Sequence, residues 1–420
     1  MLGPDTAEDS NVSLQSVPAD VLKVIDRLFR SGFAVYVVGG ALRDLRLGLA
    51  PKDWDLATDA LPEQVAAIFP RIVPIGIRHG TVMVLTKQRE IEVTTFSGSK
   101  GILGDLGRRD FTMNALALSY PEEILLDPHD GQIDLRKQTL RAVGDARSRF
   151  AEDPLRTLRA ARFVSTYGLH VEPGTLDAIA CMAESIGTTA AERVREEIFK
   201  LLSGENLLEA FDLMQGSGLL RKILPELAFL GSPPPPCRDG NSTYSHTATV
   251  IRCCPPSSRI RTAALLHSIP GSAPTVLNRW KASARLTREI VALTADQIPS
   301  AAGSWTDAQL RRYIARIGLD LLPDALDLAS AHERSLGFDP TEPGGTQELR
   351  MRISRQIEQR VPFDIKNLAI DGHDVVKILA IKPGSLVGDI LRRLHQKVLD
   401  DPALNRKEIL VEFLRKEYLK

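Results

Sequence analysis

Two aspartates flank a tryptophan in the stretch PKDWDLAT, Pro51 to Thr58. If this stretch is extended, side chains alternate between faces, so Asp53 and Asp55 point the same way and Trp54 points to the opposite face. Two carboxylates this close repel each other unless a cation or a proton lies between them. The pair therefore suits a metal site, although the doublet alone does not distinguish this from a solvated strand edge or a turn.

A glycine pair precedes the aspartates, at the end of the β-rich run FAVYVVGG. Gly39 and Gly40 would let the chain turn tightly before a helix with backbone N–H groups exposed, and the start of a helix favours anions. Arg43 lies one turn into that helix and could reach the same anion. Taken singly, such a turn is also typical of a purely structural connection, so it is compatible with a phosphate site without proving one.

A third carboxylate, Glu92, follows on the predicted strand REIEVTTF. A phosphate-suited turn with three converging carboxylates is what two-metal phosphoryl transfer requires, and Mg²⁺ needs few carboxylates because waters and substrate phosphates complete its shell. We therefore expect two Mg²⁺ ions, with Asp53 and Asp55 as catalytic metal ligands and Glu92 as a further ligand.

The elements that must position these residues alternate between helix and strand. Helical periodicity from about residue 18 to 30 is followed by the strand before the glycine pair, then by a short helix in ALRDLRLG, a strand in DWDLAT, a helix in LPEQVAAIF, and strands in TVMVLT and REIEVTTF. After about residue 145 strand signals nearly vanish and apolar residues recur at helical spacing. The sequence thus predicts a mixed α/β domain followed by mostly helical segments.

Length and composition limit the function classes. A chain of 420 residues exceeds what one core usually serves, and 53 basic residues balance 53 acidic ones, so a nucleic-acid partner would have to bind local basic surfaces. No apolar run approaches the length of a membrane span, and the first residues lack a basic start and an apolar segment. We expect a cytoplasmic protein without membrane contact whose four cysteines are reduced thiols.

Seven motifs, in order and spacing, resemble those of the class II tRNA nucleotidyltransferase and bacterial poly(A) polymerase family. They are VGGALRDLRLGLAPKDWDLAT, IGIRHGTVMV, IEVTTF, RRDFTMNALAL, LLDPHDGQIDL, AEDPLRTLRAARF and ERVREEIFKLL. The resemblance implies an α+β fold: a polymerase-β-like nucleotidyltransferase head with a mixed sheet and helices, followed by all-helical neck, body and tail. The implied domains are residues 18–145 (head), 146–230 (neck), 231–340 (body) and 341–420 (tail).

The resemblance also implies how the base is chosen. Asp153 and Arg156, three residues apart on a predicted helix, would read the base edge: the carboxylate accepts from an exocyclic amine and the guanidinium donates to a ring acceptor. Cytosine and adenine fit this pair, whereas uracil and guanine place a carbonyl against the carboxylate. Read in isolation, the two residues could also be a simple salt bridge at a helix start.

The remaining nucleotide-binding residues implied by the resemblance are mostly basic. Arg159 and Arg162 extend the same helical row toward the triphosphate, as Arg108 and Arg109 would from another segment. Asp110 and Asn114 would contact the ribose or orient these groups, although Asp110 alone is also typical of a helix cap. The full predicted nucleotide site is Gly40, Arg43, Arg108, Arg109, Asp110, Asn114, Asp153, Arg156, Arg159 and Arg162.

The body departs from many relatives, which carry a metal motif of the form H…HD. Here His246 and His267 are present, but Ser268 stands where the aspartate would be. A phosphohydrolase site needs that carboxylate to bridge two metals. We therefore expect no hydrolase activity there and interpret both histidines as core or surface residues.

A second departure is the short link between IEVTTF and RRDFT, only Ser97 to Gly107. Relatives that add the whole CCA carry a longer flexible loop there, which reshapes the base pocket from C to A, and the short form marks enzymes that stop after CC. A trimmed surface loop without consequence is the alternative interpretation.

The resemblance thus implies template-independent addition of two cytidines to the tRNA 3′ end from CTP, with release of pyrophosphate. A separate A-adding enzyme would then act next. The tRNA acceptor arm would be held through its backbone by basic residues of the neck and tail such as Arg392, Arg393 and Lys397. Full CCA addition, poly(A) synthesis and an inactive RNA-binding relative stay open as alternatives.

Overall fold

The structure is a computed structural model that describes residues 12–74, 80–96, 101–228, 243–295, 305–341 and 345–419. Its chain divides into two compact units, Met1–Pro225 and Glu226–Lys420. Within the described ranges, no helix has the length and apolar character needed to cross a membrane. The four-domain division implied by the resemblance stays a prediction.

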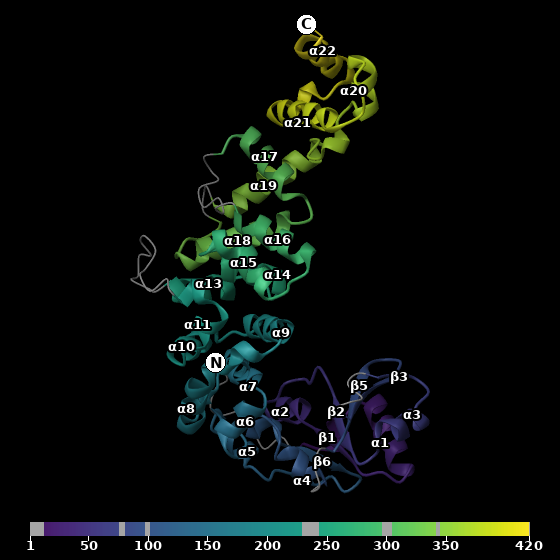
Figure 1. The fold of residues 1–420 in the computed structure, drawn as a ribbon, viewed down its shortest axis with the longest axis vertical. Helices are drawn as coiled ribbons and strands as arrows, with labels where there is room; N and C mark the ends of the chain where they lie inside the picture. Colours follow the sequence, from purple (N-terminus) through teal and green to yellow (C-terminus); the bar gives the residue numbers. More distant parts are fainter. Residues whose placement is uncertain are drawn as a thin grey trace. The chain divides into compact units, whose positions relative to one another are not determined.

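A seven-stranded sheet forms the head of the first unit, in the order β3-β4-β5-β2-β1-β6-β7. Only β2 and β5 pair in parallel, and every other neighbour is antiparallel, so the sheet is mixed as predicted. Figure 1 labels its central strands. The strands are β1 (Val35–Val38), β2 (Asp55–Thr58), β3 (Ile72–Val73), β4 (Thr81–Leu85), β5 (Glu90–Thr95), β6 (Ala117–Tyr120) and β7 (Leu125–Leu126).

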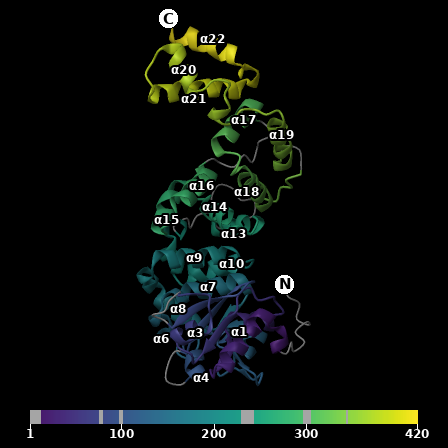
Figure 2. The ribbon, with the colours of Figure 1, turned by 90° about the vertical axis from the view of Figure 1, so that its right-hand side faces the viewer.

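The helices of the head follow the sequence pattern. In α1 (Ala19–Arg30), Val21, Val24, Ile25 and Leu28 recur at helical spacing and are all buried. α3 (Pro62–Ile68) begins with a proline at its first turn, where the missing N–H costs nothing. Both helices lie beside the sheet (Figures 1 and 2), and α1 contacts α3 and β1. The remaining head helices are α2 (Gly40–Arg46), α4 (Gly101–Leu106) and α5 (Gly131–Arg136).

Helices dominate the rest of the first unit, as predicted from the loss of strand signals. One short parallel pair, β8 (Thr139–Leu140) with β9 (His170–Val171), is the exception. α7 packs against both α9 and α10, which lie beside it in Figures 1 and 2. The helices are α6 (Ala146–Glu152), α7 (Leu155–Tyr167), α8 (Pro173–Met182), α9 (Ala191–Leu202), α10 (Leu207–Gly216), α11 (Leu219–Ile223) and α12 (Pro225–Ala228), the last at the boundary between the units.

Within its described residues, the second unit contains helices and their connections and no strand. Its last three helices enclose a core that includes Val375, Ile390, Leu394 and Leu410. The proline-rich stretch Gly231 to Ser242 lies outside the described residues. The helices are α13 (Thr243–Cys253), α14 (Ser258–Leu266), α15 (Ala273–Arg279), α16 (Ala284–Ala295), α17 (Asp307–Ile317), α18 (Leu322–Ser335), α19 (Thr346–Glu358), α20 (Gly372–Leu379), α21 (Ser385–Asp400) and α22 (Lys407–Tyr418).

The cysteines whose placement is described carry free thiols. Cys181 is exposed, Cys253 is half-buried and Cys254 is buried. Cys237 lies outside the described residues. These three cysteines form no disulfide with one another, and their reduced state stays a prediction.

Candidate active site

The glycine turn between β1 and α2 adopts a backbone that an L side chain rarely takes. Gly39 has φ +73°, and a Cβ added there would lie 3.0 Å from Nη1 of Arg109 and 3.6 Å from Oδ2 of Asp55. The absence of a side chain therefore brings a guanidinium and a carboxylate directly against the turn. This is the point where the sequence predicts phosphate binding.

Asp55 is the first residue of β2 and lies in the middle of the sheet. Its Cα partners are Val38 at the end of β1 and Glu92 on β5. Asp53 is exposed, Trp54 is 3% exposed and Asp55 is half-buried, so Trp54 is the buried residue of the three, and a common direction of the two carboxylates stays a prediction. The strand itself begins at Asp55 and not at Asp53, which places Asp53 at the rim of the site. Parallel pairing of β2 with β5 brings Glu92 beside Asp55.

The electrostatics of this carboxylate group are unfavourable without a cation. Burial first, and then the neighbouring charges of Glu92 and Asp53, raise the pKa of Asp55 to about 6, while Arg109 and Arg43 oppose the rise only in part. A divalent cation would relieve this repulsion. Carboxylate oxygens such as those of Asp55 and Glu92 suit the hard cations Mg²⁺ and Ca²⁺, but the oxygens of Asp53, Asp55 and Glu92 do not all lie within 4.8 Å of one another.

Arg43 does not point freely into solvent as a phosphate ligand would. Arg43 is 8% exposed, and its guanidinium donates to Oδ1 of Asn114 at 2.6 Å and pairs with Asp44 at 2.8 Å. It also lies 4.6 Å from the ring centroid of Tyr167 on α7. Arg43 therefore ties the helix after the glycine turn to the neck, and its predicted phosphate contact stays a prediction.

Asp110 continues this network deeper into the protein. Its carboxylate accepts from Nδ2 of Asn114 at 3.0 Å and from Nε and Nη2 of Arg159 at 2.8 and 2.6 Å. Burial alone would raise the pKa of Asp110, but Arg159, Asn114 and the backbone N–H of Phe111 outweigh it and lower that pKa to about 2. Asp110 and Asn114 thus act here as a buried link between head and neck.

The two basic residues before Asp110 differ in exposure. Arg109 pairs with Asp105 at 3.0 Å and keeps a quarter of its side chain exposed beside Gly39. Arg108 is exposed, and its backbone carbonyl accepts from Arg156 at 2.9 Å. Arg109 thus lies against the glycine turn, and the predicted triphosphate contacts of both arginines stay a prediction.

The predicted helix around the base-reading pair is interrupted, which corrects the expectation that both residues share one helix. α6 ends at Glu152, Asp153 is extended with φ −147° and ψ 98°, and α7 begins at Leu155. The physical reason is Pro154, because a proline disfavours helical backbone in the residue before it. Asp153 therefore lies at a break between helices and Arg156 in the first turn of α7.

Asp153 and Arg156, the residues predicted to read the base, both have protein partners. The carboxylate of Asp153 accepts from Nη1 and Nη2 of Arg193 at 3.2 and 2.8 Å. Arg156 donates to the carbonyls of Arg149 and Arg108 at 3.0 and 2.9 Å. These hydrogen bonds hold Asp153 and Arg156 beside the break between α6 and α7. A nucleotide bound by the two side chains would have to share or replace these hydrogen bonds.

Arg159 and Arg162 lie on one face of α7, as predicted. They pair with Glu197 of α9 at 3.6 and 3.1 Å, and Glu197 is only 4% exposed. Arg162 also stacks on the Phe163 ring with its Cζ 4.0 Å from the centroid. Burial first, and then the charge of Arg159, lower the pKa of Arg162 to about 10. Their predicted triphosphate contacts stay a prediction.

Sequence reasoning did not single out Arg193, Glu197 and Phe163. The motif ERVREEIF contained a usable signal, because Arg193 and Glu197 are four residues apart and share a helix face. Which basic or acidic residues of α7 they meet depends on how α7 and α9 pack, so the partners were not visible in the sequence.

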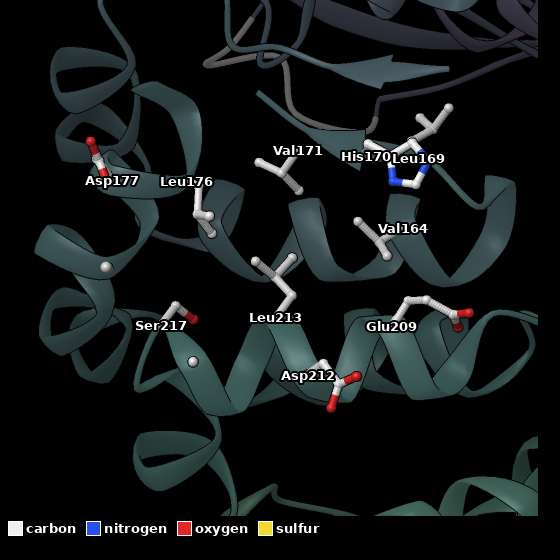
Figure 3. A pocket seen from close by; sticks show the side chains of 12 residues that line it. Val164, Leu169, His170, Val171, Leu176, Asp177, Glu209, Asp212, Leu213 and Ser217 are labelled. Atoms are coloured by element: carbon white, nitrogen blue, oxygen red, sulfur yellow. The ribbon is translucent and has the colours of Figure 1, made fainter. Parts of the chain in front are cut away.

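A separate cavity of about 570 Å³ in the first unit does not suit a nucleotide. It lies among α7, α8 and α10, and Figure 3 shows Leu176 and Leu213 pointing into the same space. Its charged lining residues are the acidic Asp177, Glu209 and Asp212. Because acidic groups repel a triphosphate, the candidate site is the glycine turn and not this cavity.

Family models match most of the chain. The Poly A polymerase head domain matches residues 35–141, the family described as "Probable RNA and SrmB-binding site of polymerase A" matches residues 168–230, and tRNA nucleotidyltransferase domain 2 matches residues 258–414. The first match covers the glycine turn, all three carboxylates and the Arg108 to Asn114 segment.

Individual proteins are similar over nearly the full length. A CCA-adding enzyme of Geobacillus stearothermophilus is 33% identical over 94% of this chain and 96% of its own, and one of Lactobacillus delbrueckii subsp. bulgaricus is 32% identical over 96% and 99%. The crystal structure of the Bacillus stearothermophilus CCA-adding enzyme in complex with CTP superposes with a TM-score of 0.76 at 30% identity, covering 94% of this chain and 96% of that one. The chain therefore belongs to the class II tRNA nucleotidyltransferase family.

Proposed function

We propose that this chain rebuilds the 3′ end of tRNA by adding C, C and A from CTP and ATP. The observation that carries the proposal is the pairing of Asp55 with Glu92 beside the Gly39 turn, with Arg109 against the same turn. The relatives that match the whole chain are CCA-adding enzymes, and one of them is solved with CTP. They support complete CCA addition better than the arrest after CC that the short link suggested.

The head would perform the phosphoryl transfer. Asp53, Asp55 and Glu92 would hold the divalent metal ions, for which we propose two Mg²⁺, and these supply charge neutralisation at the reacting phosphate. Arg109 beside Gly39 and the exposed Arg108 would orient the triphosphate. The network from Arg43 to Arg159 keeps these groups fixed relative to the neck, which favours a reactive alignment.

Asp153 and Arg156 would choose the base. The carboxylate accepts from the exocyclic amine of cytosine or adenine, and the guanidinium donates to the neighbouring ring acceptor. We propose that a bound base takes over part of the hydrogen bonding that Arg193 and the two carbonyls now provide. Uracil would place a carbonyl against Asp153 and be rejected.

A variant pair tests this assignment. Asp153→Asn should reduce the preference for CTP over UTP by about 10- to 100-fold, because one base-edge contact is worth about 1–3 kcal/mol. Glu196→Gln is the matched control, since Glu196 is an exposed acidic residue on neighbouring α9. The measurement is kcat/KM for each nucleotide. Unchanged preference in Asp153→Asn would remove this residue from base selection.

We propose that tRNA is the second substrate and is bound largely through its phosphates. Arg392 and Arg393 are exposed on α21, whereas Lys397 is half-buried with its Nζ 5.2 Å from the ring centroid of Phe413. Two exposed guanidiniums on one helix suit backbone contact without base recognition. An enzyme that accepts every tRNA needs this kind of binding.

Arrest after two cytidines is a second candidate, because one observation favours it. Of the short link, residues 101–106 form α4, and Ile102 and Leu106 are buried against the sheet. Residues 97–100 lie outside the described residues. Because most of this link forms a packed helix, few residues remain for a flexible loop that could change the shape of the base pocket from cytosine to adenine. A separate A-adding enzyme would then be required, and the comparisons do not support one.

The product made by the purified protein separates all candidates. The substrate is a tRNA lacking its CCA end, given CTP and ATP together and then ATP alone, with products resolved to single nucleotides. Extension by CCA supports the proposal, and accumulation at CC establishes the second candidate. Long adenylate tails from ATP alone would indicate a poly(A) polymerase. No extension by the protein, with intact tRNA binding, would identify an RNA-binding relative.

A further inference from the structure

Three histidines from separate helices of the second unit meet in one cluster. They come from α13 (His246), from the residue that ends α14 (His267) and from α18 (His332). One ring nitrogen of each lies within 4.8 Å of the others, and the ring centroids are 5.3 to 5.8 Å apart. Within the described ranges, no other group of three histidine, cysteine or acidic side chains is this close.

The three helices pack on one another, so the cluster is held from three sides. α13 contacts α14 and α18, α14 contacts α18, and these helices lie together in Figures 1 and 2. His246 is 8% exposed, and the other two rings are half-buried. From the sequence, His246 and His267 were interpreted as core or surface residues. His332 was not connected with them, because it lies 65 residues beyond His267.

The hydrogen bonds around the rings leave nitrogens able to bind a cation. The Nδ1 of His267 lies 2.5 Å from the carbonyl of Ala264 and must donate to it, so Nε2 keeps a lone pair. The Nδ1 of His332 is buried and has no hydrogen-bond partner among the described residues. An unsatisfied buried nitrogen is costly, and a metal ion would satisfy it.

Burial of the rings lowers the pKa of all three histidines. Two hydroxyls complete the surroundings: Oγ of Ser268 lies 3.3 Å from Nε2 of His267 and 3.1 Å from Oγ1 of Thr247.

We propose that His246, His267 and His332 form a binding site for a divalent transition metal such as Zn²⁺. Nitrogens on a tetrahedral zinc lie about 3.4 Å apart, given Zn–N distances of about 2.1 Å, so small rotations of the rings close the site. Three imidazoles without a carboxylate favour Zn²⁺, Ni²⁺ or Cu²⁺ over Mg²⁺ or Ca²⁺. Three protein ligands would leave the fourth position of a tetrahedral Zn²⁺ for water.

This site differs in chemistry from the carboxylate group of the head. It would link α13, α14 and α18, and a metal that binds only the folded protein stabilises the helices it joins. Its expected effect is on the second unit's stability and not on the phosphoryl transfer itself.

The test uses the full-length, tag-free protein after chelation. Co²⁺ and Zn²⁺ are titrated from a chelator-buffered stock in excess Mg²⁺, which saturates the carboxylate site. Readouts are bound metal per chain, the visible absorption of tetrahedral Co²⁺ and the thermal midpoint. We expect one ion per chain, the tetrahedral Co²⁺ spectrum and a raised midpoint.

Variants locate the site. His332→Gln keeps a polar side chain of similar reach and should weaken Zn²⁺ binding by about 100-fold or more, since even partners that only orient a ligand contribute 10- to 100-fold. His267→Gln should do the same. His373→Ala is the matched control because His373 is exposed on α20, and it should bind as the wild-type protein does.

Three results would overturn the proposal: no metal bound at micromolar free Zn²⁺, an octahedral Co²⁺ spectrum, or equal binding by His332→Gln and the wild-type protein. Circular dichroism confirms that each variant is folded. If His332→Gln does not fold, His267→Gln and the wild-type spectrum decide the question. A folded His332→Gln that retains the wild-type affinity rejects the site outright.

Discussion

Replacing Asp55 by asparagine should stabilise the metal-free head while abolishing nucleotide addition. The pKa of Asp55 is raised from 3.8 to about 6 by burial, Glu92 and Asp53. At pH 8 the ionised carboxylate therefore lowers the free energy of unfolding by about 3 kcal/mol relative to a neutral side chain. Asparagine has the same shape and no charge, so it removes this penalty together with a metal ligand.

The sign of the pH dependence follows from the raised pKa. A carboxyl group with a raised folded-state pKa binds its proton more tightly in the folded protein than in the unfolded chain. Its stabilising contribution to the free energy of unfolding is therefore fully present below about pH 4 and lost as the pH rises through about 6. The advantage of Asp55→Asn over the wild-type protein should thus be small at pH 4, grow between pH 4 and 6, and level off above pH 7.

Urea unfolding in a chelating buffer measures this difference. Hydrogen exchange of peptides from β1, β2 and β5 reports on the head separately from the helical units. Added Mg²⁺ provides an internal control, because it should stabilise the wild-type head and have little effect on Asp55→Asn. A pH-independent difference, or an Asp55→Asn head less stable than the wild-type head at pH 8, would refute the reasoning.

Three further predictions concern other parts of the site. Gly39→Ala should cost about 1–3 kcal/mol of stability, because its φ of +73° strains any L side chain, and urea unfolding measures it. Arg159→Ala should cost about 3–5 kcal/mol by leaving the buried Asp110 carboxylate unpaired. Because the pKa of Asp110 is lowered to about 2, its stabilisation is present above pH 4 and lost as the pH falls toward 2, and this acid dependence should disappear in Arg159→Ala. Replacing Arg392 and Arg393 by glutamine should weaken tRNA binding and reduce the slope of log K against log salt by about 1 to 2, and a slope equal to that of the wild-type protein would exclude them from phosphate contact.

Local patterns made much of the head predictable. The apolar spacing of α1, the contrast between exposed Asp53 and buried Trp54 and the glycine pair after β1 depend on neighbouring residues alone, so periodicity and turn chemistry were enough to predict them. The proline that separates α6 from α7 was also visible in the sequence. Its effect on Asp153 was missed because the helical periodicity on both sides suggested a continuous helix.

The sequence by itself determined which chemical groups this chain carries: the paired aspartates, the glycine turn and the arginine-rich segments. Only the tertiary structure decided which of them meet. The parallel pairing of β2 with β5 places Glu92 beside Asp55, and the packing of α7 on α9 brings Arg159 and Glu197 together. The cluster of three histidines likewise depends on the packing of α13, α14 and α18. Such contacts join residues far apart in the chain, and they form because separate apolar faces bury one another, which no local pattern specifies.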